Sequence, residues 1–281
     1  MLTPHVVPLV GGRSTEHDAS IHSWLGLLQD IQRRPGKLVV PELFFSSRTG
    51  EIRHFRTYLP SSVEDFEGGA SITFSRFLDH VRAYPPNVFL FSLLHGNEGE
   101  DGAWQGVAEV CDLKGTFGSV FASSVSMNKW AQAILAREIC GDECKLPRTW
   151  LLAPWNLQTR LQAAVVELQD KPFIIKPNQM GASLLTELYR NPLQSCVEAH
   201  LREIFAFDRG ALLQEYIEGV EYTVGCIELE DGIKHLPVIS VRPERGFLGH
   251  REKHKNDVKL DVTMHTDDND LTLTLKRLSY A

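Results

Sequence analysis

The chain has 281 residues, of which 43% are hydrophobic and 23% charged, with a formal net charge of −7 and five cysteines. This composition is typical of a globular protein with two or three small cores. The negative charge argues against nucleic acid and anionic membrane surfaces as main partners. The cysteines are odd in number and scattered along the chain, so no disulfide framework is predicted. We see neither a signal peptide nor a run of about 20 apolar residues that would span a membrane, so we expect a cytoplasmic protein.

The first third of the chain alternates apolar runs with helical patterns. The apolar residues 6–10 lead into Gly11 and Gly12, and a helical periodicity follows over residues 21–31. A strand, a glycine turn and a helix in this order open a Rossmann-like unit. Residues 46–70 are polar and rich in turn residues. Further strands are expected over 38–45 and 88–94, and further helices over 74–84, 104–110 and 123–139.

The segment over residues 87–106 is the most unusual part of the sequence. Its apolar run stops at His95, and Glu98, Glu100 and Asp101 follow among glycines. In open α/β sheets, ligands bind beyond the carboxyl ends of the strands. The sequence therefore predicts a ligand site in this loop, with a solvated acidic loop as the alternative.

The second half of the chain also alternates strands and helices. Asp231 and Gly232 lie between two strand-like runs and are typical of a hairpin turn. Residues 258–279 read as a strand, a polar turn at 265–270 and an alternating final strand, LTLTLKRL. The other elements expected here are strands over 149–152, 173–176, 184–189, 211–216 and 222–229, and helices over about 156–169 and 193–207.

Three segments of the second half carry groups suited to a nucleotide. Lys176 ends an apolar strand, and the following NQMGAS loop offers backbone N–H groups and a serine hydroxyl, which can hold phosphates. Lys129 lies in the first turn of an expected helix. Residues 212–224 place an aromatic side chain, carboxylates and a glycine between strands, which suits an adenine and ribose edge. For each segment alone, the alternative is a lysine that extends into water or a solvated turn.

Six motifs occur in order along the chain: GGRSTEHDAS, LHGNEGEDGAWQG, SMNKW, IIKPNQMGAS, LQEYIEGVEYTV and LPVISVRPERGF…EKH. This series closely resembles the D-alanine–D-alanine ligase family of ATP-grasp enzymes, over roughly residues 5–255. The resemblance implies an α/β fold with a Rossmann-like N-terminal (pre-ATP-grasp) domain, followed by an ATP-grasp fold whose C-terminal part is incomplete. The implied domains are 1–123, a central lobe at 124–211 and a truncated C-terminal lobe at 212–281.

The resemblance implies that ATP drives the ligation of two D-amino acids through an acyl phosphate, for peptidoglycan precursor synthesis. By motif, Glu16 would hold the ammonium group of the first D-amino acid, and His95 would lie near its carboxylate. The implied phosphate contacts are Lys129, Lys176 and Lys253, with Gly181 and Ser183 in the closing loop. The implied adenine and ribose contacts are Gln214, Tyr216, Ile217 and Glu221.

Some positions differ from the family pattern. Ala182 stands where the first of two serines is expected, and Gln214 replaces a glutamate. His254 replaces a tyrosine that, in the family, forms a hydrogen-bonded set with the residues matched by Ser183 and Glu16. These differences concern the catalytic group Glu16, His95, Ser183, Lys253 and His254.

The metal ligands differ most. In the family, carboxylates on a final strand pair bind Mg2+, which needs oxygen ligands, but here the alignment retains only Asp261, with Lys259 in place of an arginine. His250 and His254 in HREKH have a zinc-like spacing without the HExxH order.

The sequence leaves three alternatives beside an active ligase. One is a degenerate ATP-grasp protein that binds nucleotide or amino acid without ligation. The second is a D-amino acid ligase with a different second substrate, and the third is a shortened version of a longer ligase. The expected partners are small molecules, ATP and D-amino acids, and a second copy of the chain, because members of the family are usually dimers.

Overall fold

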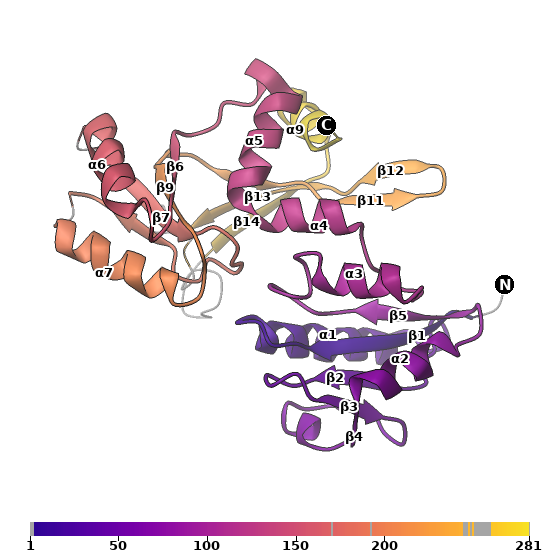
Figure 1. Ribbon diagram of the computed structural model, residues 1–281. Coiled ribbons are helices and arrows are strands. Elements are labelled where there is room, and N and C mark those ends of the chain that lie inside the picture. The colour runs from indigo at the N-terminus through magenta and orange to yellow at the C-terminus, as the bar shows by residue number, and fades with distance from the viewer. Residues whose placement is uncertain are drawn as a thin grey trace. The chain divides into compact units, whose positions relative to one another are not determined.

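The computed structural model describes residues 3–169, 171–191, 193–243, 247, 249 and 260–280. The chain forms two compact units, Met1–Asn128 and Lys129–Ala281 (Figure 1). The finer division into three domains stays a prediction. Among the described residues, every helix is too short or too polar to cross a bilayer.

The first unit contains a five-stranded sheet in the order β4-β3-β2-β1-β5. β2 and β5 pair in parallel with β1, while β3 and β4 are antiparallel additions on the β2 side. The strands of this sheet are β1 (His5–Gly11), β2 (Leu43–Ser46), β3 (Ile52–Phe55), β4 (Ala70–Ile72) and β5 (Val88–Ser92). The helical elements of the unit are α1 (His17–Arg33), η1 (Glu64–Glu67), α2 (Phe74–Arg82), α3 (Ala103–Val110) and α4 (Val120–Met127).

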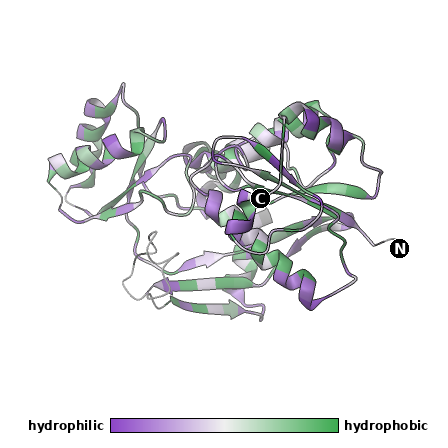
Figure 2. Ribbon diagram, turned by 90° about the horizontal axis from the view of Figure 1, so that it is seen from below, coloured by the Kyte–Doolittle hydropathy of each residue, from purple (hydrophilic) through white to green (hydrophobic). Residues whose placement is uncertain are grey.

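Helices cover both faces of this sheet, which explains the uninterrupted apolar run of β1. Because successive side chains of a strand point to opposite faces, Val7 packs with Phe77 of α2 in one core cluster, and Val10 packs with Trp24 of α1 in another. The helices carry both hydrophobic and hydrophilic residues, as expected for helices that cover a sheet (Figure 2).

The second unit contains a four-stranded antiparallel sheet in the order β6-β9-β7-β8. Leu168 of α6 and Leu201 of α7 are fully buried with Ile175 and Leu213 of the sheet in one core cluster. These elements are β6 (Thr149–Leu152), α6 (Leu157–Leu168), β7 (Phe173–Pro177), β8 (Glu187–Tyr189), α7 (Gln194–Phe205) and β9 (Ala211–Glu215).

A three-stranded sheet and a separate hairpin complete the described part of the second unit. The predicted hairpin is confirmed, and its two turn residues are Glu230 and Asp231, with Gly232 opening the second strand opposite Leu229. The sheet is made of β10 (Glu221–Thr223), β13 (Val238–Pro243) and β14 (Leu260–His265), and the hairpin of β11 (Cys226–Leu229) and β12 (Gly232–His235). Besides α6 and α7, the helical elements described in this unit are α5 (Lys129–Cys140), η2 (Gly141–Glu143) and α9 (Asp270–Tyr280).

Several element predictions were wrong. The polar stretch 46–70, for which no element was predicted, contains β3, η1 and the first residue of β4. The single helix expected over 123–139 is two helices, because Asn128 has an extended backbone (φ −90°, ψ 97°) that ends α4. The single strand expected over 222–229 is divided into β10 and β11.

The prediction of a final strand at LTLTLKRL was also wrong, because this segment forms α9. The Asn269 side-chain oxygen accepts hydrogen bonds from the backbone N–H groups of Leu271 (3.1 Å) and Thr272 (3.0 Å). This is the arrangement of a helix N-cap. Thr272 is buried, and its hydroxyl donates to the Asp267 carbonyl at 3.1 Å. The leucines of this segment alternate as in a strand, but Leu271, Leu275 and Leu278 also have the spacing of one helix face. The pattern fits both structures, and the Asn269 cap favours the helix.

Candidate functional site

In the first unit, the loop after β5 is held against the start of α1. The Ser14 hydroxyl donates to the His95 carbonyl oxygen at 2.6 Å and accepts the Glu16 N–H at 3.1 Å. The His95 Nε2 atom lies 2.9 Å from the Ser23 hydroxyl of α1. These contacts bring Glu16 and His95, the two predicted substrate contacts, to the same place.

His95 lies among carboxylates. Its Nδ1 atom is 3.9 Å from Oε1 of Glu100, whose other oxygen accepts the Gly96 N–H at 2.7 Å. The Glu100 carboxylate raises the pKa of the His95 imidazole, and the charge of Glu16 adds to this effect against the opposing effect of burial. His95 in turn lowers the pKa of Glu100. The loop thus favours an imidazolium beside two carboxylates, which can recognise a carboxylate and an ammonium group on one small molecule.

Glycines and one buried glutamine fix the path of this loop. The Gln105 side chain accepts the Gly102 N–H at 3.0 Å and donates to the Gly99 carbonyl at 2.8 Å. Gly102 has a φ of +100°, which residues with a Cβ rarely adopt. A Cβ on Gly99 would lie 2.6 Å from the Leu94 Cβ atom and 2.7 Å from the Leu94 carbonyl carbon. The glycines are therefore required by close packing.

In the second unit, three adjacent strands present a row of polar side chains. The Lys176 ammonium of β7 donates to Oε1 of Gln214 on β9 at 2.8 Å. The Gln214 amide donates to the Thr149 hydroxyl of β6 at 2.9 Å. Gln214 lies opposite Thr149 and Ile174 in the sheet register, so strand pairing fixes its position in this row.

Lys129 reaches the segment that follows β7. Its backbone N–H donates to the Asn178 carbonyl at 3.1 Å, and its ammonium group donates to the Met180 carbonyl. The Asn178 side chain accepts the Trp130 N–H at 2.9 Å, so a residue distant in sequence caps the start of α5. Of the two predicted phosphate contacts, Lys176 therefore belongs to β7, and Lys129 is hydrogen-bonded to the loop that follows β7.

The loop after Gly181 has an unusual backbone. Ala182, Ser183 and Leu185 have φ values of 51°, 53° and 50°. Residues with a Cβ adopt this left-handed region at a cost of about 1 kcal/mol or more each. Two turn hydrogen bonds close the loop, from the Leu184 N–H to the Gly181 carbonyl at 3.1 Å and from the Thr186 N–H to the Ser183 carbonyl at 3.2 Å.

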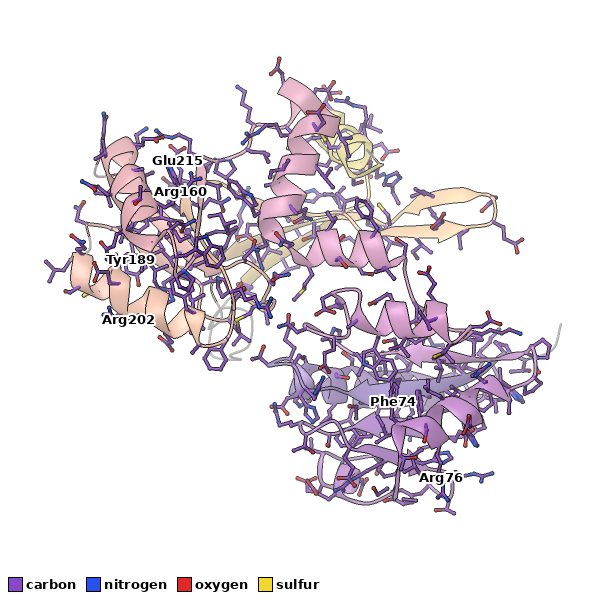
Figure 3. The ribbon with its side chains drawn as sticks, viewed as in Figure 1. Phe74, Arg76, Arg160, Tyr189, Arg202 and Glu215 are labelled. Atoms are coloured by element: carbon purple, nitrogen blue, oxygen red, sulfur yellow. The ribbon has the colours of Figure 1, made fainter. Side chains whose placement is uncertain are left out.

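The predicted adenine and ribose contacts lie at and beyond the end of β9. The Tyr216 ring lies under the Arg190 guanidinium, 5.6 Å from its central carbon to the ring centroid, within cation–π distance. The side chains of Ile217 and Glu221 are exposed, and Glu221 is the first residue of β10. Beside them, Glu215, which is labelled in Figure 3, forms an ion pair with Arg148 at 3.2 Å.

Of the remaining predicted site residues, only Asp261 lies in a part of the chain that the structure describes. Asp261 lies on β14, exposed and opposite Arg242 in the register. Lys253, His254 and His250 lie outside the described residues, so their roles stay predictions.

Sequence reasoning missed three residues that organise the two loops: Ser23, Thr149 and Asn178. Of these, only Asn178 stood inside a motif that had been singled out. The partners of Ser23 and Asn178 are 72 and 48 residues away in sequence, so no local pattern could show these contacts.

Residues 150–278 match the family model described as "D-ala D-ala ligase C-terminus". The chain is 32% identical over 164 residues to a D-alanine–D-alanine ligase of Syntrophotalea carbinolica, covering 58% of this chain and 49% of that relative. It is 24% identical over 260 residues to a D-alanine–D-alanine ligase of Caulobacter vibrioides, covering 92% of this chain and 67% of that relative. The chain spans about half the length of the first curated relatives it matches.

The fold is also similar to solved structures. The VanG D-Ala:D-Ser ligase from Enterococcus faecalis matches with a TM-score of 0.75 at 19% sequence identity, over 99% of this chain and 81% of that chain. The predicted fold class, a Rossmann-like N-terminal part followed by an ATP-grasp part, is confirmed. The family model over residues 150–278 and the curated relatives together show that the chain is similar to D-alanine–D-alanine ligases.

Proposed function

We propose that this protein is an ATP-dependent carbon–nitrogen ligase that joins two D-amino acids through an acyl phosphate, as a step in peptidoglycan precursor synthesis. The observation that carries this proposal is that Lys176 lies on β7 and that the Lys129 ammonium donates a hydrogen bond to the loop after β7. Catalysis of phosphoryl transfer depends mostly on positioning and on neutralising phosphate charge. Two lysines beside a loop with a glycine and a serine supply both.

The second unit would hold the nucleotide. Lys129 and Lys176 would contact phosphates, and Gly181 and Ser183 belong to the loop that would close over them. Gln214, Tyr216 and Ile217 would line the adenine and Glu221 would bind the ribose, while Lys253 would approach the terminal phosphate. ATP, when bound, supplies the phosphoryl group that activates a carboxylate. The hydrogen bond from Lys176 to Gln214, which lies opposite Ile174 in the register, supports this assignment.

The first unit would hold the first amino acid. The Glu16 carboxylate suits an ammonium group, and an imidazolium at His95, favoured by Glu100, suits a carboxylate. Ser183 and His254 would complete the catalytic group, and the change from tyrosine to histidine bears on the choice of second substrate. The solved VanG structure of similar fold is titled a D-Ala:D-Ser ligase. A different second D-amino acid is therefore included in the proposal.

Asp261 would be a ligand for Mg2+. It is exposed on β14, and Mg2+ is commonly held by one or two carboxylates together with substrate phosphates and waters. One carboxylate therefore fits a metal that is shared with a nucleotide. The expected homodimer and cytoplasmic location stay predictions, and light scattering of the purified chain tests the dimer.

The experiment is a panel of D-amino acids and D-hydroxy acids mixed with the purified chain, ATP and Mg2+, with phosphate release as the readout. We expect release that depends on the added substrate and is strongest with one or two members of the panel. L-alanine is the matched control. Phosphate release that is the same with every addition, or absent throughout, would overturn the proposal.

One observation favours a second candidate function, nucleotide binding without ligation. Where the resemblance implies a strand that carries further metal ligands, the structure has α9. Calorimetry with ATP and Mg2+ separates the two functions. Binding without turnover on the whole panel would favour the second candidate, and substrate-dependent turnover would exclude it.

A further inference from the structure

We propose that Glu42, His54 and His80 form a binding site for a divalent transition metal of the zinc class in the first unit. Their ligand atoms all lie within 4.8 Å of one another. The His54 Nε2 atom is 2.6 Å from Oε2 of Glu42, and the His80 Nε2 atom is 2.9 Å from Oε1 of the same carboxylate. This site is independent of the ligase function proposed above and uses none of its residues.

Three elements bring these residues together. Glu42 immediately precedes β2, His54 lies on β3, and His80 lies in the last turn of α2. Since β2 and β3 pair with Phe44 opposite His54, the strand register fixes the height of His54 beside Glu42. The ligands therefore come from the sheet and from a helix packed on it, which are rigid supports for a metal site.

Aromatic packing holds both imidazole rings in place. The Phe44 ring stacks on His54 at a centroid distance of 4.4 Å and an interplanar angle of 21°, and meets His80 edge-on at 5.7 Å. The centroids of the two imidazole rings are 4.9 Å apart. Phe44 is fully buried, so the rings rest on a fixed part of the core.

The ligand set suits a metal of the zinc class. Two imidazole nitrogens and one carboxylate oxygen are a common three-ligand set for zinc, and leave a fourth position for water. Tetrahedral zinc at its usual bond lengths separates its ligand atoms by about 3.3 Å. The present separations of 2.6 and 2.9 Å are therefore close to those of a bound site, and a small widening would admit the ion.

The surroundings support the carboxylate and give access to it. Glu42 is 6% exposed and also accepts a hydrogen bond from the Tyr84 hydroxyl at 2.5 Å. Such outer hydrogen bonds orient metal ligands. The Arg56 guanidinium lies 3.7 Å from Oε2 of Glu42, but its side chain is 70% exposed and can turn toward solvent.

A hollow leads to the two histidines. It is lined by Ile72, Arg76 and Asp79 together with His54 and His80. Arg76 is exposed and lies at the outer edge of the first unit (Figure 3). An ion can therefore reach the imidazoles from solvent on the side where Asp79 adds a carboxylate.

Metal binding has a chemical requirement. An ionised carboxylate only accepts hydrogen bonds, so both Nε2 atoms now donate to Glu42. To coordinate a metal, each Nε2 proton must be released to solvent or replaced by a proton on Nδ1. The hydrogen-bonded group without a metal is the competing explanation for the cluster, and the experiment distinguishes the two.

The experiment titrates Zn2+ alone into the untagged full chain after treatment with a chelator, by calorimetry, with Co2+ absorption as a second readout. We expect one strong site with the visible bands of Co2+ bound in a four-coordinate geometry. His80→Gln should weaken this binding at least tenfold. Two matched controls should not change it: His22→Gln on the exposed face of α1, and His250→Gln in the HREKH motif.

Binding equal in the wild type and His80→Gln would overturn the proposal, as would the absence of a strong site in the wild type. A measurement on the wild type alone covers the case in which His80→Gln does not fold. One equivalent of Zn2+ should shift the imidazole proton signals of His54 and His80 in an NMR spectrum. Shifts confined to other histidines would overturn the proposal as well.

Discussion

The two loops that carry the candidate site are built in different ways. In the loop after β5, two of the three residues with positive φ are glycines, Gly96 and Gly102, and Glu98 is the exception. In the loop after β7, Ala182, Ser183 and Leu185 adopt positive φ. Each residue with a Cβ in this region costs about 1–3 kcal/mol. The first loop is thus a closely packed cradle, and the second stores backbone strain.

The difference indicates different roles in binding. A closely packed loop keeps its shape and can recognise a small, rigid ligand such as an amino acid. A strained loop loses little when it rearranges, so a ligand can reorganise it with modest binding energy. We therefore expect the loop after β7 to move when phosphates bind, and the loop after β5 to keep its conformation.

The largest effect on stability is expected for Gly99→Ala. The new Cβ atom would stand within 2.8 Å of three Leu94 atoms, two of them in the backbone. Overpacking of this kind lowers the free energy of unfolding by about 3 kcal/mol. Urea denaturation followed by circular dichroism measures it. The control Gly26→Ala, in open space on α1, should raise that free energy by about 1 kcal/mol. Equal midpoints for Gly99→Ala and wild type would show that the first loop is not closely packed.

The next effect concerns nucleotide binding. Lys176→Met removes a charged donor from the row beside Gln214. A hydrogen bond to a charged group contributes about 1.5–3 kcal/mol, so ATP affinity should fall about 10- to 100-fold. Calorimetry measures the affinity. The control Lys171→Met removes an exposed lysine paired with Glu215 in the same unit and should change it little. Similar losses in both variants would contradict the assignment of Lys176.

The strain of the second loop predicts a smaller effect of opposite sign to Gly99→Ala. Ala182→Gly should raise the free energy of unfolding of the second unit by about 1 kcal/mol, because glycine adopts positive φ without strain. The control Ala163→Gly, on the exposed face of α6, should lower it by about 1 kcal/mol. Thermal or urea unfolding measures both. A destabilised Ala182→Gly would contradict the idea of a strained loop.

The smallest effect concerns the ionisation of the first loop. Glu100→Gln should lower the pKa of His95 toward its ordinary value of 6.5, since Glu100 is the main cause of the raised pKa. NMR titration of the imidazole protons measures this change. The control Glu109→Gln, on α3, should not alter the pKa of His95. An unchanged pKa in Glu100→Gln would show that the pair does not interact in solution.

The interaction between His95 and Glu100 makes the stability of the fold depend on pH, and the directions of the two pKa shifts fix the sign. A histidine with a raised pKa stabilises the fold fully below 6.5, and this contribution is lost as the pH rises through the raised pKa. A glutamate with a lowered pKa stabilises the fold above 4.5, and this contribution is lost as the pH falls through the lowered pKa. The difference in stability between wild type and Glu100→Gln should therefore be greatest between pH 4.5 and 6.5.

Apolar runs predicted the central strands well. β1 and β7 were predicted almost to the residue, because each is a short apolar run bounded by glycine or proline. β3 and the edge strand β4 were missed because both are short and lie in or at the end of a polar stretch. α9 was missed because its leucines fit both a strand and a helix, and the Asn269 cap decides between them.

The candidate site was predictable to the extent that it depends on ordered motifs. Motif order placed Glu16 with His95, and Lys129 with Lys176. In the structure Glu16 lies near His95, and Lys129 is bonded to the loop after the strand of Lys176, while the roles of these residues stay predictions. The supporting contacts of Ser23 and Asn178 were not predictable, because they join residues far apart in sequence. The Glu42, His54 and His80 cluster was missed for the same reason.

The central claim is that this chain uses ATP to join D-amino acids. Its most direct test is incubation with ATP, Mg2+ and the D-amino acid that gives the most phosphate, followed by measurement of phosphate and, by mass spectrometry, of dipeptide. The claim predicts equal molar amounts of phosphate and D,D-dipeptide, both lost in Lys176→Met and kept in Lys171→Met. Phosphate without dipeptide, or neither product while ATP remains bound, would contradict it.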